Sequence, residues 1–275
     1  YSSAASDVYK RQCVHPSADC AEGSRIRLGR PGESKMKAII RWIFLRLGYD
    51  VIRHVIMPKS PFAVLDLLVG ARVASGHKPV VVQIGANDGV RADPVRHLIR
   101  QYDLSGLLVE PLPDLFALLQ SNYADCPNLR FEQCAVADVD GHVPLYRVRP
   151  DPSLPDWLQG LASLNRNHLT STKFEFDEFD KYVEEVTVPA LTLASLLKKH
   201  GMSEIGLLQI DTEGFDCRIV ESAIRSGVRP AIINYEHIHV HAREQAACKR
   251  LLQENGYDFV DVGIDTLAVR RVSSS

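Results

Sequence analysis

The chain alternates between short apolar runs and amphipathic stretches. Its clearest apolar run is Val80–Ile84, which ends in a turn bounded by Gly85 and Gly89. Short apolar runs between turn residues are typical of strands buried on both faces. Runs of this kind predict strands at residues 80–84, 106–110, 129–134, 205–210, 231–236, 257–262 and 266–270.

Stretches with apolar residues at helical spacing lie between these strands. They predict helices at residues 92–102, 112–121, 192–200, 214–225 and 242–255. Strands that alternate with helices indicate an α/β domain with a mostly parallel sheet covered on both faces. The last two strands follow each other closely, so we expect them to form a terminal antiparallel hairpin.

The part of the chain before Val80 is predicted to form a helical extension, residues 36–78. Apolar residues recur at helical spacing over 36–57, with basic residues on the other side, and a second helix is expected over 62–74. A stripe of this kind usually packs on its own domain. Peripheral contact of residues 37–47 with a membrane or a partner remains the alternative.

The first 35 residues are expected to contribute nothing to the fold. Residues 2–12 resemble the in-frame translation of a sequencing-library adapter, and residues 13–35 have no hydrophobic periodicity, so we predict disorder. Gly32-Glu33 can be encoded by a purine-rich string of the kind that positions bacterial ribosomes. We therefore hypothesise that translation starts at Met36, and peptides upstream of Met36 in the native protein would refute this.

The longest stretch without clear periodicity is residues 149–186. Pro150 lies near its start, but Trp157 and Leu161 make it too apolar for pure disorder. Loops of this length in compact domains are usually lids or binding loops. We interpret it as a lid-like insertion in a domain that spans residues 79–275.

Composition and charge exclude several classes of protein. The sequence has 45% hydrophobic and 24% charged residues, a net charge of -2 and no basic patch interleaved with aromatic residues, so a nucleic-acid partner is not expected. The six cysteines form no CxxC pair, which argues against a zinc site and a disulfide framework. No apolar run is long enough to span a membrane and no signal peptide is recognisable, so we expect a cytoplasmic location.

The glycine-bounded turn and the end of the next strand suggest a nucleoside site. Gly85 allows backbone to come close to a ligand, and Gly89 allows close packing where a helix begins. Glu110 ends the second strand and can accept both ribose hydroxyl protons. The GxxxG spacing lacks the third glycine of a pyrophosphate-binding loop, which argues against a nicotinamide dehydrogenase.

Further candidate residues follow the fourth predicted strand. Asp211 and Glu213 precede Gly214, at the strand end where open α/β sheets bind their ligands. The alternative for Asp211 is to cap the following helix. Glu213 either acts on substrate or supports the turn.

Histidines follow the fifth predicted strand, directly after Glu236. His237 and His239 are candidate general bases because histidine exchanges a proton near neutral pH. Together with His241 they have the alternate spacing that could hold a metal ion if the segment stays extended, although surface or capping histidines are commoner. We assign no metal ligands from the sequence. Asn165 and His168, in the predicted lid, are weaker candidates for substrate contact.

Four motifs in order carry a specific family resemblance. They are Gln83–Gly89, Val109–Pro111, Ala135–Asp138 ahead of Gly141, and Gln209–Gly214. Over residues 80–270 the chain resembles the FkbM-type family of S-adenosylmethionine-dependent methyltransferases. The resemblance implies a Rossmann-like class I methyltransferase fold, with a seven-stranded, mostly parallel sheet and a C-terminal antiparallel hairpin. It also implies O-methylation of a sugar, a glycan or a small-molecule hydroxyl.

The resemblance also implies roles for single residues. The turn residues Gly85, Ala86, Asn87 and Gly89 would hold the methionine part of the cofactor, and Glu110 its ribose. Ala135 and Val136, after Cys134 at the end of the third strand, would meet the adenine. Asp211 would lie beside the methyl group and the acceptor. Gln83 stands where the common family pattern has an acidic residue, so its contact with the cofactor's amino group is expected to differ.

Two alternatives to a methyltransferase remain. A protein of the same ancestry could bind the cofactor without catalysis, which the presence of Asp211 and Glu213 disfavours. An oxidoreductase using a nicotinamide cofactor is disfavoured by the missing glycine and by the predicted terminal hairpin.

Overall fold

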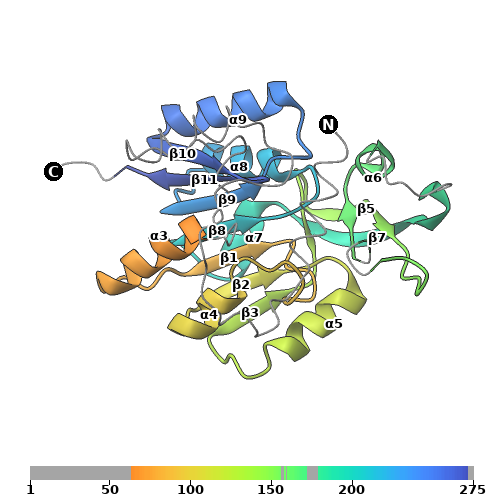
Figure 1. Ribbon diagram of the computed structural model, residues 1–275, viewed down its shortest axis with the longest axis horizontal. Coiled ribbons are helices and arrows are strands. Elements are labelled where there is room, and N and C mark those ends of the chain that lie inside the picture. The colour runs from red at the N-terminus through yellow and green to blue at the C-terminus, as the bar shows by residue number, and fades with distance from the viewer. Residues whose placement is uncertain (1–62, 156–157, 159, 172–178, 272–275) are drawn as a thin grey trace, which may run out of the picture.

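The main body of the protein is a seven-stranded sheet between two layers of helices (Figure 1). The computed structural model describes residues 63–155, 158, 160–171 and 179–271. The sheet has the order β10-β11-β9-β8-β1-β2-β3. Neighbouring strands from β3 to β9 run parallel, whereas β11 is antiparallel to both β9 and β10. This topology confirms the predicted class I methyltransferase sheet with its terminal hairpin.

Each strand of this sheet lies where the apolar runs predict it. The strands are β1 Val81–Ile84, β2 Gly106–Val109, β3 Leu129–Glu132, β8 Leu207–Ile210, β9 Ile232–Glu236, β10 Tyr257–Val262 and β11 Asp265–Arg270. All residues of β1, β2, β8 and β9 are buried, which explains why these strands read as continuous apolar runs. The third strand ends two residues earlier than predicted, at Glu132.

Helices cover both faces of the sheet, as predicted. One apolar core lies under α3 Ala63–Ala74, α4 Arg96–Tyr102 and α5 Pro113–Asn122, and a second core lies under α7 Leu193–Lys199, α8 Asp216–Arg225 and α9 Ala242–Glu254. Helix α4 starts four residues later than predicted. The preceding turn is fixed by Asp93, whose Oδ1 accepts the N–H groups of Val95 and Arg96.

A second, four-stranded sheet with the order β4-β7-β5-β6 projects from the main body on the right of Figure 1. Its strands are β4 Ala135–Val136, β5 Gly141–Val148, β6 Ala162–Ser163 and β7 Val183–Leu191, and it also carries α6 Arg166–Ser171 and the 3-10 turn η1 Phe179–Tyr182. The predicted lid-like insertion over 149–186 therefore begins directly after β5, and it contains regular structure that its sequence pattern does not show. Strands β6 and β7 enter that range, and β5 precedes it.

The sequence hides these strands because their alternation is interrupted. Pro144 lies inside β5 and Pro189 inside β7, and proline within a run argues against a strand. Both sheet positions are exposed, so neither ring disturbs the core. Full pairing of β5 with β7, from Gly141–Ala190 to Val148–Val183, stabilises the two strands together.

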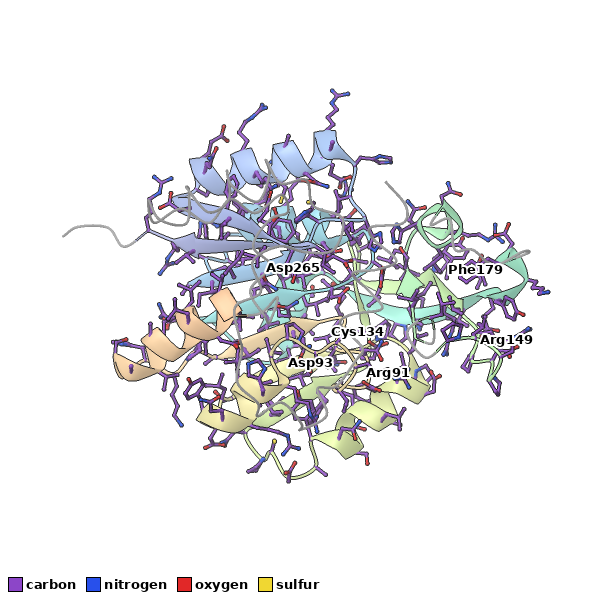
Figure 2. All side chains as sticks on the ribbon, viewed as in Figure 1. Arg91, Asp93, Cys134, Arg149, Phe179 and Asp265 are labelled. Carbon is purple, nitrogen blue, oxygen red and sulfur yellow. The ribbon has the colours of Figure 1, made fainter. Side chains whose placement is uncertain are left out.

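The second sheet is fastened to the main body by a bidentate ion pair. Arg147 in β5 is buried, and its Nη1 and Nη2 donate to Asp114 Oδ1 and Oδ2 in α5 at 2.9 and 2.7 Å. Paired hydrogen bonds of this kind fix orientation as well as distance. The outer part has its own small core around Phe179, which Figure 2 labels beside Arg149 on this side of the molecule.

Several expectations concern residues outside the described part. They are the adapter-like and disordered residues 1–35, the start at Met36, the amphipathic helix with its membrane contact at 37–47, and Trp157. Within the described part, no helix is both long enough and apolar enough to cross a membrane.

Candidate active site

The glycine-bounded turn after β1 lies directly against the end of β8. Gly85 has a φ of 77°, and a Cβ there would overlap the carbonyl oxygen of Asp211. The Asp211 N–H in turn donates to Ile84 O at 3.0 Å. A Cβ at Gly89 would run into Tyr123 and Leu119 of the α5 region. The two glycines therefore allow the turn, Asp211 and α5 to pack closely together.

Glu110 connects this turn to the end of β2. Its Oε2 accepts the N–H of Asn87 at 2.9 Å, and its Oε1 accepts the N–H of Leu112 at 3.0 Å. The carboxyl group is buried, and burial raises its pKa to about 7 although both N–H groups favour the ionised form. Each carboxylate oxygen keeps further lone pairs, so the group can also accept hydrogen bonds from a ligand.

An acidic side chain does lie beside Gln83, although position 83 itself is not acidic. Gln83 is buried, and its side chain lies beside the carboxyl group of Asp93. Burial raises the pKa of Asp93. In the part of the chain that is described, Gln83 Oε1 has no hydrogen-bond partner. Sequence reasoning missed Asp93 because it follows the turn rather than the strand.

Ala135 and Val136, the predicted adenine contacts, lie outside the main sheet. Both are buried in β4, which pairs with β7 of the second sheet instead of extending β3. Their contact with a cofactor remains a prediction.

Three carboxyl groups meet at the ends of β8 and β9. Asp211, Glu213 and Glu236 each offer an oxygen within 4.8 Å of the others. In this acidic cluster, Glu213 and Glu236 are 8% and 3% exposed, whereas Asp211 is only partly buried. Asp265, from the start of β11, adds another buried carboxyl group nearby, and Figure 2 labels it over the β9–β11 side of the sheet.

Two histidines join the cluster at Glu213. His239 Nε2 lies 3.4 Å from Glu213 Oε2, and His168 Nε2 lies 3.5 Å from the same oxygen. The two rings meet edge to face, with centroids 4.2 Å apart. His239 follows β9, whereas His168 belongs to α6 of the second sheet. The second sheet therefore completes a site that the main sheet begins.

Burial and mutual repulsion dominate the electrostatics of this cluster. The pKa of Asp211 is raised well above its usual range by burial and by the Glu213 and Asp216 carboxylates. The pKa of Glu236 is raised for the same reasons, burial first and then the charges of Asp211 and Glu213. Burial lowers the pKa of His239, so its imidazole is neutral near pH 7.

The loop between β8 and α8 is held by Asp216, which sequence reasoning missed. Its Oδ2 accepts the Thr212 hydroxyl at 3.0 Å and the Gly214 N–H at 3.2 Å, and burial raises its pKa to about 6. Glu213 has a φ of 53°, an uncommon conformation for a residue with a side chain. Ser163 of β6 donates to the Glu213 carbonyl oxygen at 2.7 Å. The loop conformation is thus fixed from both sheets.

The structure does not bring every candidate into the cluster. His237 Nδ1 lies 3.0 Å from Thr266 Oγ1, toward the terminal hairpin, and His241 is exposed at the start of α9. The chain turns after Glu236, so the extended three-histidine metal site is wrong. Asn165 is exposed, and its side chain accepts the Asn167 N–H.

Comparison with known proteins identifies one matching family profile. The profile is described as "Methyltransferase FkbM domain" and matches residues 83–259. No curated protein matches the chain.

Solved structures are similar at low identity. A methyltransferase FkbM from Methylobacillus flagellatus is 13% identical with a TM-score of 0.44, and the match covers 70% of this chain but only 43% of that one. An RNA methyltransferase from Salinibacter ruber, in complex with S-adenosyl-L-homocysteine, is 11% identical with a TM-score of 0.39 and coverages of 80% and 98%. A magnesium protoporphyrin IX methyltransferase from Synechocystis, with bound S-adenosylmethionine, is 11% identical with a TM-score of 0.39. That match covers 88% of this chain and 100% of the other.

Proposed function

The chain belongs to the FkbM family of S-adenosylmethionine-dependent methyltransferases, and on that premise we propose that it methylates a hydroxyl oxygen. The acceptor is a sugar, a glycan or another small molecule, as the family resemblance implies. The observation that carries the proposal is the direct contact between the Gly85 turn and Asp211. It joins the expected cofactor site to a carboxyl group that can receive the acceptor's proton.

The residues at the end of β1 and β2 fit the cofactor. Glu110 has lone pairs for two ribose hydroxyl groups while it holds Asn87 and Leu112. The buried Gln83 Oε1, which lacks a hydrogen-bond partner among the described residues, suits an ammonium donor such as the amino group of the methionine part. The nearby Asp93 supplies the acidic character that Gln83 lacks.

S-adenosylmethionine, when bound, supplies an electrophilic methyl group on a sulfonium centre. The protein's task is to hold the acceptor oxygen in line with that methyl group and to receive the hydroxyl proton as the oxygen–carbon bond forms. We assign the proton to Asp211, whose carboxyl group becomes a stronger base because burial and the neighbouring carboxylates raise its pKa. His239 is the second candidate, since its imidazole is neutral and lies in the same cluster.

The acceptor side is assigned to the second sheet. β6 and α6 place Ser163 and His168 against Glu213, so a molecule that reaches Asp211 also meets this sheet. The cytoplasm, where cysteines stay reduced, suits the four described cysteines, which are all free.

The proposal is tested by methyl transfer from isotopically labelled cofactor to a panel of sugars, glycans and small hydroxyl compounds. Transfer that gives an alkali-stable ether on one class of acceptor, and that is lost in Asp211→Asn, would support it. Cofactor binding with no transfer to any acceptor would favour a non-catalytic binding protein. Binding of a reduced nicotinamide cofactor instead would favour the oxidoreductase.

A further inference from the structure

The acidic cluster contains buried acceptor atoms that nothing in the described part of the chain satisfies. Glu236 is only 3% exposed, and its Oε2 has no hydrogen-bond partner there. His239 Nε2 also has no hydrogen-bond partner among the described residues. These two atoms point at each other across 3.8 Å. A buried, unpaired carboxylate oxygen is costly, so a native structure is expected to supply a partner.

The charge of the cluster indicates that the expected partner is a cation. Asp211, Glu213 and Glu236 place three carboxyl groups within one small volume. In the described residues, no lysine or arginine forms an ion pair with Asp211 or Glu236. A compact cation would neutralise this repulsion.

The spacing of the ligand atoms matches coordination by one ion. His239 Nε2 lies 3.4 Å from Glu213 Oε2 and 3.8 Å from Glu236 Oε2, and both distances are longer than those of good hydrogen bonds. Atoms bound to a common ion at about 2.1 Å lie about 3.0–4.2 Å apart.

We infer that His168, Glu213 and His239 bind one divalent first-row transition-metal ion of the Mn²⁺, Fe²⁺ or Zn²⁺ type, and that Glu236, 3.8 Å from His239, balances its charge. Two imidazoles with carboxylates suit these ions, whereas Mg²⁺ and Ca²⁺ prefer oxygen ligands. The ion would join the two sheets, since His168 comes from α6 and the other ligands follow β8 and β9. Sequence spacing could not show this set, because His168 lies 45 residues before Glu213.

The ion would also sharpen the proposed methyl transfer, and this step alone rests on the proposed function. An acceptor hydroxyl bound at the ion loses its proton more readily. Asp211 lies between the ion site and the Gly85 turn and receives that proton. Metal binding itself requires neither cofactor nor acceptor.

The test is a Co²⁺ titration of the full-length protein after chelator treatment, followed by visible absorption and metal analysis. We expect one Co²⁺ per chain, an absorption spectrum that reports nitrogen and oxygen ligands, and a melting temperature that rises with Co²⁺. Zn²⁺ should displace Co²⁺, whereas millimolar Mg²⁺ should not. Absence of stoichiometric binding would overturn the inference.

Matched variants test which residues bind the ion. His168→Ala and His239→Ala should each weaken Co²⁺ binding by more than about 100-fold, beyond the 10- to 100-fold typical of residues that only orient a ligand. His241→Ala is the control, since it removes an exposed histidine of the same segment. Glu236→Gln keeps the shape of the side chain and removes its charge, so it should stay folded and bind Co²⁺ more weakly.

Two outcomes separate this inference from the methyltransferase proposal. Wild-type Co²⁺ binding that is unchanged in folded Glu236→Gln and in His168→Ala would overturn the metal site. Co²⁺ binding without S-adenosylmethionine binding would leave the metal site standing and remove the methyltransferase.

Discussion

At the end of β2, both carboxylate oxygens of Glu110 accept backbone N–H groups, whereas at the end of β9 the Oε2 of Glu236 has no hydrogen-bond partner among the described residues. Both groups are buried, and burial raises the pKa of each. The first environment is complete and has lone pairs to spare for neutral hydroxyl groups. In the second environment, neighbouring carboxyl groups repel each other, and a cation would stabilise them. One sheet edge thus carries the proposed cofactor site beside the proposed metal site.

The largest expected effect comes from the residue that joins the two regions. Asp211→Asn keeps the shape of the side chain but removes the proton acceptor, so turnover should fall by about 10³- to 10⁴-fold. Cofactor affinity should stay within a few-fold, because the Gly85 turn contacts the Asp211 backbone and not its carboxylate. Turnover with a saturating acceptor, beside a cofactor titration, measures both. A variant with near wild-type turnover would remove Asp211 from the role of base.

Gly85→Ala tests the contact between the two regions itself. The new Cβ would overlap the Asp211 carbonyl oxygen at a φ of 77°, so the variant should lose about 4 kcal/mol of unfolding free energy, or fail to fold. Gly76→Ala is the control: its φ is 85°, but no atom lies within 4 Å of the added Cβ, so it should cost only about 1 kcal/mol. Chemical denaturation measures both. Equal losses would mean that backbone conformation, and not the close approach, explains the glycine.

The pH dependence of folding stability measures how much the burial of the Glu110 carboxylate costs. Its pKa rises from 4.5 to about 7 on folding, so the unfolded chain ionises first as the pH increases. This group's contribution to stability is therefore complete below about pH 4.5 and is lost as the pH rises through 7. Glu110→Gln should remove that fall, roughly 2–3 kcal/mol between pH 4.5 and 7.5.

Glu132, at the end of the neighbouring strand β3, should change the stability with pH in the opposite direction. Burial would raise the pKa of Glu132, but hydrogen bonds from Lys199 and His200 outweigh it and lower the pKa. Its contribution should be present above about pH 4.5 and disappear in acid. Unfolding curves from pH 4 to 8 for Glu110→Gln and Glu132→Gln would contradict this account if both variants shifted in the same direction.

The smallest expected effect concerns how the second sheet supports the cluster. Ser163→Ala removes the hydrogen bond to the Glu213 carbonyl oxygen and should cost about 1–2 kcal/mol, since both groups are buried. Ser195→Ala, whose hydroxyl bonds to the exposed Asp140, should cost about 0.5 kcal/mol. Thermal unfolding compares the two. A larger loss in Ser195→Ala would mean that β6 is not what holds the Glu213 loop.

The contrast between the two regions also explains what the sequence could predict. β1, the glycine turn and Glu110 follow one another in a local pattern of burial and turn residues, so strand, turn and candidate site were all visible. The terminal hairpin was visible for the same reason. Asp211 and Glu213 could be placed at a strand end because parallel strands share that edge.

The other members of the acidic cluster come together through strand pairing that no local sequence pattern shows. Pro144 and Pro189 mask β5 and β7, and the sheet that those strands form is what carries His168 to Glu213. Asp216 reads as an ordinary residue at a helix start, although it fixes the loop. His237 and His239 are two residues apart, and only the turn after Glu236 sends one toward the cluster and the other toward Thr266.

The most direct test of the central claim is calorimetric titration of S-adenosylmethionine and S-adenosylhomocysteine into the full-length protein and its Glu110→Ala variant. Binding in the micromolar range is expected for wild type, and the variant should bind at least about 100-fold more weakly, since two charge-assisted hydrogen bonds to the ribose are lost. Asp125→Ala, an exposed carboxylate paired with Arg100 after α5, should bind like wild type. No binding to folded wild-type protein, or equal binding to Glu110→Ala, would contradict the assignment of the cofactor site to the ends of β1 and β2.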